Sequence, residues 1–223
     1  MKMKLLFQAL FKFLAGILLF GLLLFLPAGT LRYPGGWLFC GLLFIPMLFL
    51  GIALLLFAPD LLKKRLQSDE TESAQKKVVA GAALMFMAGF VAAGLDFRFG
   101  LTQVPRGVVI AAAAVLLLSY GMYAEVMREN AYLSRSVEIQ DGQKLIDTGL
   151  YGIVRHPMYT ATIFLFLSIP LVLGSLVSLA FFLAYPVLIA RRVRNEEAVL
   201  EAGLPGYRDY QKKVRYRLIP WIW

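Results

Sequence analysis

The polar segment around the only histidine, His156, carries the residue types best suited to binding and catalysis. It contains the sequence R-H-P-x-Y, which runs from Arg155 to Tyr159. After an apolar stretch the chain reads R-x-x-x-E-E, in which Arg192 and Glu196 are four residues apart and so share one face of a helix. Histidine and glutamate can hydrogen-bond the polar ends of a ligand, and arginine offers a fork of donors to a carboxylate or phosphate. These two segments are therefore the candidate site.

Each of these residues also has a purely structural interpretation. Arginines and lysines at the ends of membrane helices usually extend toward the interface or contact lipid phosphates. The pair Glu196-Glu197 could be the solvated face of a helix, and Pro157 could simply begin one. Taken singly, each residue favours the structural interpretation, so a functional one depends on their arrangement.

The rest of the chain indicates a membrane protein built of α-helices. Hydrophobic residues make up 60% of the 223 residues, above the ~45–50% that is typical of soluble domains. The mean hydropathy is +0.71. Four apolar stretches reach the ~20 residues that cross a bilayer, and the third is rich in glycine and alanine, which let helices approach closely. We expect these spans at about Ala9–Leu26, Trp37–Phe57, Val78–Leu95 and Gly107–Tyr123.

A further apolar stretch, from Thr160 to Ala190, is too long for one span and too short for two full ones. Pro170, Gly174 and Ser175 near its centre favour a short helical hairpin over one kinked helix. Basic residues number three at the N-terminus, five in the second loop, four in the fourth loop and eight in the tail, against one in the first loop and two in the third. The positive-inside rule places the four richer segments in the cytoplasm, which requires an even number of crossings. We therefore predict an all-α bundle of about six membrane helices, with a C-terminal hairpin and both termini cytoplasmic.

Other features narrow the classes of protein further. The net charge is +9, but the basic residues flank apolar stretches, which favours anionic lipid and argues against nucleic acid. The single cysteine, Cys40, has no metal-ligand neighbours, so neither an internal disulfide nor a metal site is expected. The N-terminal apolar run could be a secretory signal. Lys12 interrupts it and no A-x-A site follows, which favours a first transmembrane helix.

The order of motifs in the C-terminal part gives a resemblance to a known family. The chain reads G-x-Y-x-x-x-R-H-P-x-Y, a short apolar hairpin, R-x-x-x-E-E, Y-x-x-Y at Tyr207 and Tyr210, and a terminal I-P. This order resembles the isoprenylcysteine carboxyl methyltransferase family, in the form of a bacterial-type membrane methyltransferase. The resemblance implies variable transmembrane helices at 1–125 and a methyltransferase core at 126–223. It also implies S-adenosylmethionine as cofactor and methyl transfer at a cytosol-facing membrane site.

The resemblance assigns roles to individual residues. Arg192 would anchor the substrate and Glu196 would hold the cofactor, so both are candidate catalytic residues. The interval before Tyr207 is shorter than in eukaryotic members, which leaves open whether Glu196 or Glu197 is the main cofactor carboxylate. The implied cofactor-binding residues are Lys144, Leu145 and Ile146 through their backbone, with Tyr151, His156, Pro157, Met158, Tyr159, Glu196 and Glu197.

The proposed chemistry suits these residue types. Methyl transfer to a carboxylate, amine or thiol is an in-line displacement that depends on alignment and exclusion of water. Since a carboxylate is already ionised at neutral pH, carboxyl O-methylation needs no strong base, and we assign His156 to the cofactor pocket. The apolar hairpin can admit a lipid tail, so the expected substrate is a lipid or a lipid-linked small molecule. The compact chain favours a bacterial inner membrane.

Two other functions fit parts of the sequence. Sterol-type membrane reductases, which use NADPH, resemble the same C-terminal layout and need no G-x-G-x-x-G motif. A non-enzymatic transporter or scaffold is the third possibility. Transport usually leaves ionisable residues within the spans, whereas here Asp96 and Glu125 lie only at helix ends.

Overall fold

A computed structural model describes residues 2–66, 73–133 and 139–223, and every regular element within these ranges is a helix. The elements are α1 (Lys2–Ala28), α2 (Pro34–Phe57), α3 (Pro59–Leu66), α4 (Ser73–Phe99), α5 (Arg106–Glu129), the 3-10 helix η1 (Gly149–Gly152), α6 (Pro157–Leu173), α7 (Leu176–Phe182), α8 (Tyr185–Gly203) and α9 (Tyr207–Lys213). The predicted all-α class is confirmed.

Within the residues that the structure describes, six stretches of helix have the apolar character of membrane helices. Five are long and apolar enough to cross a bilayer: α1, α2, α4, α5 and the nearly continuous α7–α8 pair. The sixth, α6, is a shorter apolar helix of 17 residues. The predicted bundle of about six membrane helices is therefore confirmed. The first helix begins well before Ala9, because hydropathy marks only the apolar part of a helix while backbone hydrogen bonding continues through its polar end.

The predicted C-terminal hairpin is present, and its turn lies at the predicted residues. Gly174 ends α6 with φ +78°, a left-handed conformation that glycine adopts without steric cost. Ser175 then caps α7, and its side chain accepts a hydrogen bond from the Ser178 backbone N–H. The returning leg consists of α7 and α8, and α8 continues past the apolar residues and carries Arg192 and Glu196 on one helix, as predicted.

Buried polar contacts fix the tip of this hairpin to the rest of the bundle. Asp96, near the end of α4, is 1% exposed and accepts a hydrogen bond from the Ser175 hydroxyl over 2.5 Å. It also accepts one from the Thr102 backbone N–H over 2.7 Å. The Tyr33 hydroxyl donates to the Leu173 carbonyl over 2.7 Å. With the tip held in this way, the opposite ends of α6 and α8 have a fixed relative position.

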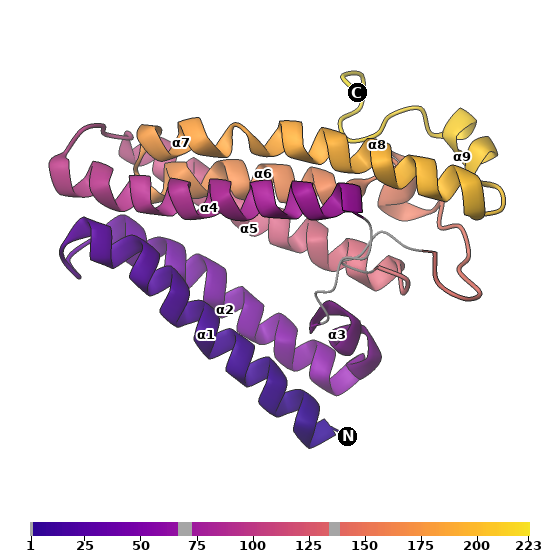
Figure 1. Cartoon of the computed structure of the whole chain (residues 1–223), viewed down its shortest axis with the longest axis horizontal. Helices are drawn as coiled ribbons and strands as arrows, with labels where there is room; N and C mark the ends of the chain where they lie inside the picture. Colours follow the sequence, from indigo (N-terminus) through magenta and orange to yellow (C-terminus); the bar gives the residue numbers. More distant parts are fainter. Residues whose placement is uncertain (1, 67–72, 134–138) are drawn as a thin grey trace.

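The helices from α4 to α8 run side by side, and the α1–α2 pair leans away from them (Figure 1). The two groups meet where α1 ends: a Cβ atom added to Gly94 of α4 would lie 2.6 Å from the Leu24 carbonyl oxygen. Both termini, α3 and α9 lie toward the same end of the molecule (Figure 1). The membrane side that this end faces remains a prediction.

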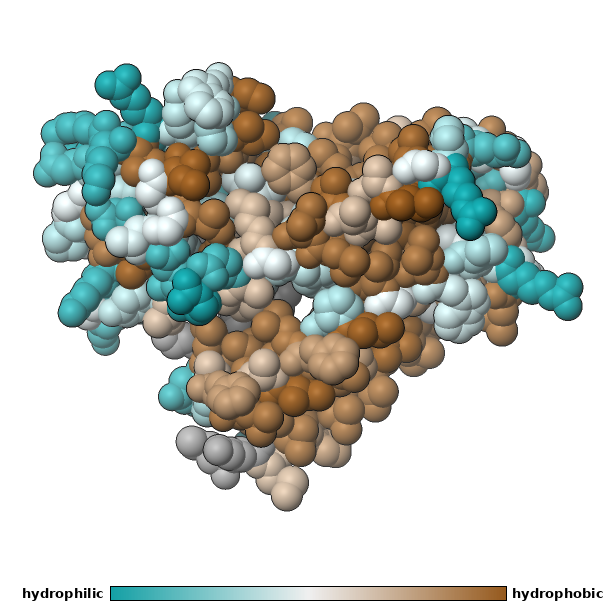
Figure 2. Space-filling model, turned by 180° about the vertical axis from the view of Figure 1, so that it is seen from behind, coloured by the Kyte–Doolittle hydropathy of each residue, from teal (hydrophilic) through white to brown (hydrophobic). Residues whose placement is uncertain are grey.

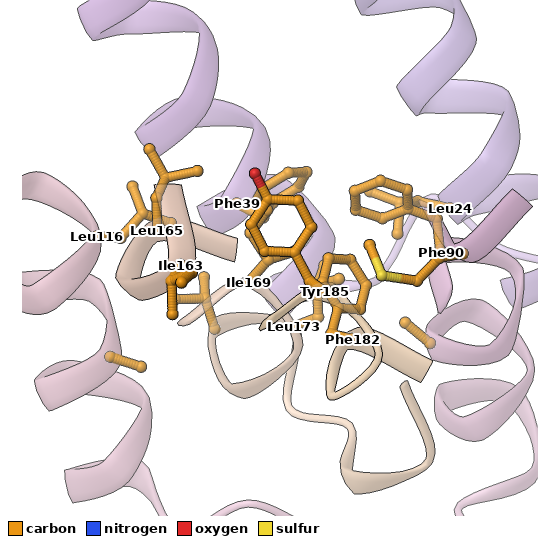
Figure 3. Packing of buried hydrophobic residues seen from close by; sticks show 14 of the residues in the cluster. Leu24, Phe39, Phe90, Leu116, Ile163, Leu165, Ile169, Leu173, Phe182 and Tyr185 are labelled. Carbon is orange, nitrogen blue, oxygen red and sulfur yellow. The ribbon is translucent and has the colours of Figure 1, made fainter. Parts of the chain in front are cut away.

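The main apolar cluster contains residues from both of the expected segments, 1–125 and 126–223. The labelled side chains in Figure 3 come from both. Phe90 of α4 and Phe182 of α7 meet edge to face, with ring centroids 5.6 Å apart. This contact is possible because the neighbouring residue of α4, Gly89, has no side chain: an added Cβ would lie 2.5 Å from the Phe182 ring. The small residues of the third span therefore allow close helix packing, as predicted.

The outer surface matches a lipid environment. Figure 2 shows hydrophobic residues over most of the rear face, with hydrophilic residues gathered at the two ends of the molecule. Large apolar side chains on α1 and α2 are exposed, as lipid-facing residues must be. They include Phe7, Phe11, Leu18, Trp37, Phe49 and Phe57.

Candidate functional site

The segment that enters α6 is held in place by the C-terminal tail. The backbone N–H of Arg155 donates to the Tyr216 carbonyl over 2.9 Å, and that of His156 donates to the Arg217 carbonyl over 2.9 Å. One turn into α6, the Thr160 hydroxyl donates to the Leu218 carbonyl over 2.7 Å. The tail therefore runs along the start of α6 and fixes the backbone on which His156 stands.

Glu197 is the centre of a buried ionic cluster behind this segment. Its carboxylate accepts hydrogen bonds from Arg155 Nε and Arg217 Nε, each over 2.7 Å, and lies 3.3 Å from His156 Nε2. Glu197 is 3% exposed. A buried carboxylate is tolerated only when it is paired and hydrogen-bonded, and these contacts meet that requirement. Glu197 thus joins α8, the entry to α6 and the tail.

Glu196, one position earlier, points in another direction. The Tyr159 hydroxyl donates to Glu196 Oε2 over 2.5 Å and accepts a hydrogen bond from Arg192 Nε over 2.8 Å. Arg192 and Glu196 are one helical turn apart on α8, so a single tyrosine from α6 can contact both. The His156 ring stacks near this tyrosine, with centroids 5.9 Å apart.

These side chains face a cavity at the end of the bundle where the tail packs. It holds about 870 Å³ of space between atoms, its open mouth included. Nine of the residues predicted to form the site line it: Lys144, Leu145, Ile146, Tyr151, His156, Met158, Tyr159, Arg192 and Glu196. The fold thus brings together side chains from the loop before α6, from α6 itself and from α8.

Two residues predicted to bind the cofactor do not line the cavity. Pro157 is the first residue of α6 and is fully buried among the helices. Glu197 lies behind the wall, because successive residues of a helix point about 100° apart, and it is occupied by Arg155 and Arg217. Of the two adjacent glutamates, only Glu196 faces the cavity.

Three further lining residues, Arg155, Tyr207 and Tyr210, belong to the sequence motifs but were given no role in the site. The lining residues that were not singled out from the sequence are Asn130, Tyr132, Leu133, Gln143, Val199, Leu200 and Leu204. Val199 and Leu200 follow Glu196 by three and four residues, so helical spacing alone could have found them. The contributions from the end of α5 could not be found in this way, because nothing local indicates that this end approaches α8.

Tyrosines make up much of the cavity wall. The Tyr151 hydroxyl accepts a hydrogen bond from Asn130 Nδ2 over 2.8 Å, and the Tyr210 hydroxyl donates to the Tyr151 carbonyl over 2.7 Å. Burial raises the pKa of Tyr151 to about 12. Its phenol therefore stays neutral at physiological pH and serves as a hydrogen-bonding group.

The comparison with protein families agrees with this arrangement. The model of the isoprenylcysteine carboxyl methyltransferase family matches residues 108–202, which run from α5 almost to the end of α8. This segment, which is a little under half of the chain, is therefore similar to the isoprenylcysteine carboxyl methyltransferase family. The family segment contains the R-H-P-x-Y element and both glutamates, whereas the tail that packs against them lies beyond it.

A solved structure and a curated relative extend the comparison. The structure of the eukaryotic intramembrane Ras methyltransferase, isoprenylcysteine carboxyl methyltransferase, matches with a TM-score of 0.53 and 22% identity, over 92% of this chain and 74% of that one. This match shows that the chain shares that protein's fold over nearly its whole length. The Delta(14)-sterol reductase TM7SF2 of Mus musculus is 32% identical over 85 residues, which are 37% of this chain and 20% of the reductase. The chain thus matches only about a fifth of that relative's length.

Proposed function

We propose that this chain is an integral membrane methyltransferase that uses S-adenosylmethionine to methylate the carboxylate of a lipidic acceptor at the cytoplasmic face. The match of residues 108–202 to the family supports the reaction class. The observation that carries the proposal is the Arg192–Tyr159–Glu196 chain of hydrogen bonds, which puts a cation and a carboxylate on one cavity wall.

The residues of the cavity fit this cofactor. S-adenosylmethionine carries a positive charge, ribose hydroxyls and an amino-acid tail, and would supply the electrophilic methyl group. Glu196 offers a carboxylate for its donors, and the backbone of Lys144, Leu145 and Ile146 offers further hydrogen-bonding groups on the cavity wall.

The residues of this chain would act by positioning rather than by proton transfer. Arg192 can present paired N–H donors to an acceptor carboxylate. The Tyr159 hydroxyl bonds both Arg192 and Glu196 and so fixes the positions of their side chains relative to each other. An acceptor on Arg192 and a cofactor on Glu196 would therefore meet in a fixed geometry. His156 lies between Tyr159 and Glu197 and would hold the Tyr159 ring in position on the cavity wall. An ionised carboxylate needs no base, and the apolar bundle excludes water.

Cofactor binding and acceptor class are tested separately. Purified protein in nanodiscs is titrated calorimetrically with S-adenosylmethionine and with NADPH. We expect binding of the first only. Binding of NADPH without binding of S-adenosylmethionine would instead support a reductase, the class of the curated relative.

The acceptor is then identified with a labelled methyl donor. A carboxylic acid, an amine and a thiol with the same alkyl chain are compared as substrates, and we expect a base-labile ester from the acid. Arg192→Lys should raise the acceptor KM more than it weakens cofactor binding, because lysine cannot replace the planar fork. Faster labelling of the amine or thiol would contradict the carboxylate assignment.

A further inference from the structure

Five tyrosines line the cavity, and one differs from the others. Four of the five have hydrogen-bond partners for their hydroxyls. The partners of three were described above, for Tyr151, Tyr159 and Tyr210. The fourth, Tyr132, donates its hydroxyl hydrogen to the Gly142 carbonyl over 3.1 Å. The Tyr207 hydroxyl, by contrast, has no hydrogen-bond partner among the residues that the structure describes. Tyr207 is only 3% exposed, so bulk water does not replace the missing partner.

The fold holds this ring firmly in place. Gly206, with φ +82°, turns the chain between α8 and α9, and Tyr207 is the first residue of α9. Its ring packs in a small apolar cluster with Leu204, Tyr210 and Val214. An unsatisfied buried hydroxyl is costly and uncommon in native proteins. Because Tyr207 is also a lining residue of the cavity, a ligand bound there can supply the partner that this rigid, buried hydroxyl lacks.

The charges around Tyr207 limit what this partner can be. Burial raises the pKa of Tyr207 well above its usual range, and the nearby Glu197 and Glu196 carboxylates raise it further. The phenol therefore keeps its hydrogen and needs an acceptor. An ammonium group could contact Glu196 but cannot accept from Tyr207, and a carboxylate could accept but would be repelled by Glu196. A hydroxyl group can do both, since it accepts from Tyr207 and donates to Glu196.

We propose that the Tyr207 hydroxyl binds a ribose hydroxyl of the nucleoside cofactor, which places the sugar between α9 and Glu196. This inference rests on the proposed function and extends it, because it orients the cofactor within the cavity. It also gives α9, which lies beyond the segment matched by the family, a direct part in binding.

The test compares Tyr207→Phe with Tyr210→Phe in nanodiscs, using S-adenosylhomocysteine as the probe. Tyr207→Phe removes an unpartnered hydroxyl, so the ligand-free protein should keep its Tm or gain slightly, while affinity falls about tenfold. Tyr210→Phe breaks an existing bond to the Tyr151 carbonyl and should lower the Tm of the ligand-free protein. Unchanged affinity in Tyr207→Phe, or a loss of Tm equal to that of Tyr210→Phe, would overturn the inference.

A second comparison identifies the group on the ligand. Methylthioadenosine retains the ribose and lacks the amino-acid tail, so Tyr207→Phe should weaken its binding by the same factor. The 2′-deoxy and 3′-deoxy analogues of methylthioadenosine each lack one ribose hydroxyl. The analogue that lacks the hydroxyl bound by Tyr207 should bind the wild type and Tyr207→Phe with equal affinity. If Tyr207→Phe binds both analogues more weakly than the wild type does, by the same factor, the sugar is not the partner. Failure of the wild type to bind any of these nucleosides would instead refute the proposed function.

Discussion

Arg155 Nε lies 2.7 Å from Glu197 Oε1, and both side chains are buried. This ion pair joins the loop before α6 to α8, while the neighbouring Glu196 faces the cavity. Two adjacent glutamates that look equivalent in the sequence therefore have different surroundings, which leads to the first prediction.

Glu197→Gln should destabilise the protein strongly. It removes the charge that Arg155 and Arg217 share and leaves a buried guanidinium without its counter-ion, at a cost of about 3–5 kcal/mol in the free energy of unfolding. Thermal unfolding in detergent measures the effect. Glu201→Gln, on the exposed side of the same helix, is the matched control and should stay within about 0.5 kcal/mol of wild type.

Glu196→Gln should affect cofactor binding more than stability. We expect a small change in Tm and a marked loss of cofactor affinity. If Glu197→Gln were stable but could not bind cofactor, Glu197 rather than Glu196 would be the cofactor carboxylate.

Gly94→Ala should separate α1 from α4. The added Cβ would lie 2.6 Å from the Leu24 carbonyl oxygen and 3.0 Å from the Ala28 nitrogen, and neither backbone atom can move freely. We expect a loss of about 1–3 kcal/mol, measured as a lower Tm in detergent. Gly121→Ala in α5 is the control: a Cβ there meets no atom of the described chain within 4 Å, so helix propensity should leave stability unchanged or slightly raised. Equal effects of the two substitutions would contradict this contact.

Alkaline conditions should weaken the fold through its buried tyrosines. Burial raises the pKa of Tyr151 to about 12, whereas an unfolded tyrosine titrates near 10. A group whose folded pKa is raised contributes its full stability below the unfolded pKa and loses it as pH rises. Stability should therefore fall between about pH 10 and pH 12, by up to roughly 1.4 kcal/mol per pH unit for this residue. Unfolding midpoints measured across this range should fall less steeply for Tyr151→Phe, and identical slopes would exclude a contribution from this phenol.

The cavity end should face the cytoplasm. Because Cys40 is the only cysteine, Cys40→Ala gives a background in which single cysteines can be placed at Lys212, near the cavity, and at Leu101, between α4 and α5. Both positions are exposed. In intact bacterial cells an impermeant maleimide should label Leu101→Cys and spare Lys212→Cys, with the reverse in inverted vesicles. Labelling of Lys212→Cys in intact cells would contradict the proposed topology and place the cavity end outside the cytoplasm.

Much of the fold could be predicted from the sequence, because a bilayer imposes simple rules. Apolar length predicts spans, and the uneven distribution of basic residues favoured the hairpin, whose turn lies at Gly174 and Ser175. The motif order also indicated nine residues that now line one cavity. These features depend on local composition and spacing, which a single sequence displays directly.

The rest was decided only by tertiary structure. The sequence favoured Glu196 but left open whether Glu197 is the main cofactor carboxylate, and the two are distinguished because the tail brings Arg217 against Glu197. Arg155 is in the motif, but its burial follows from contacts with carbonyls nearly sixty positions along the chain. The unpartnered hydroxyl of Tyr207 exists only because α9 folds back over the cavity. Such long-range contacts come from packing, and residue type and spacing do not encode them locally.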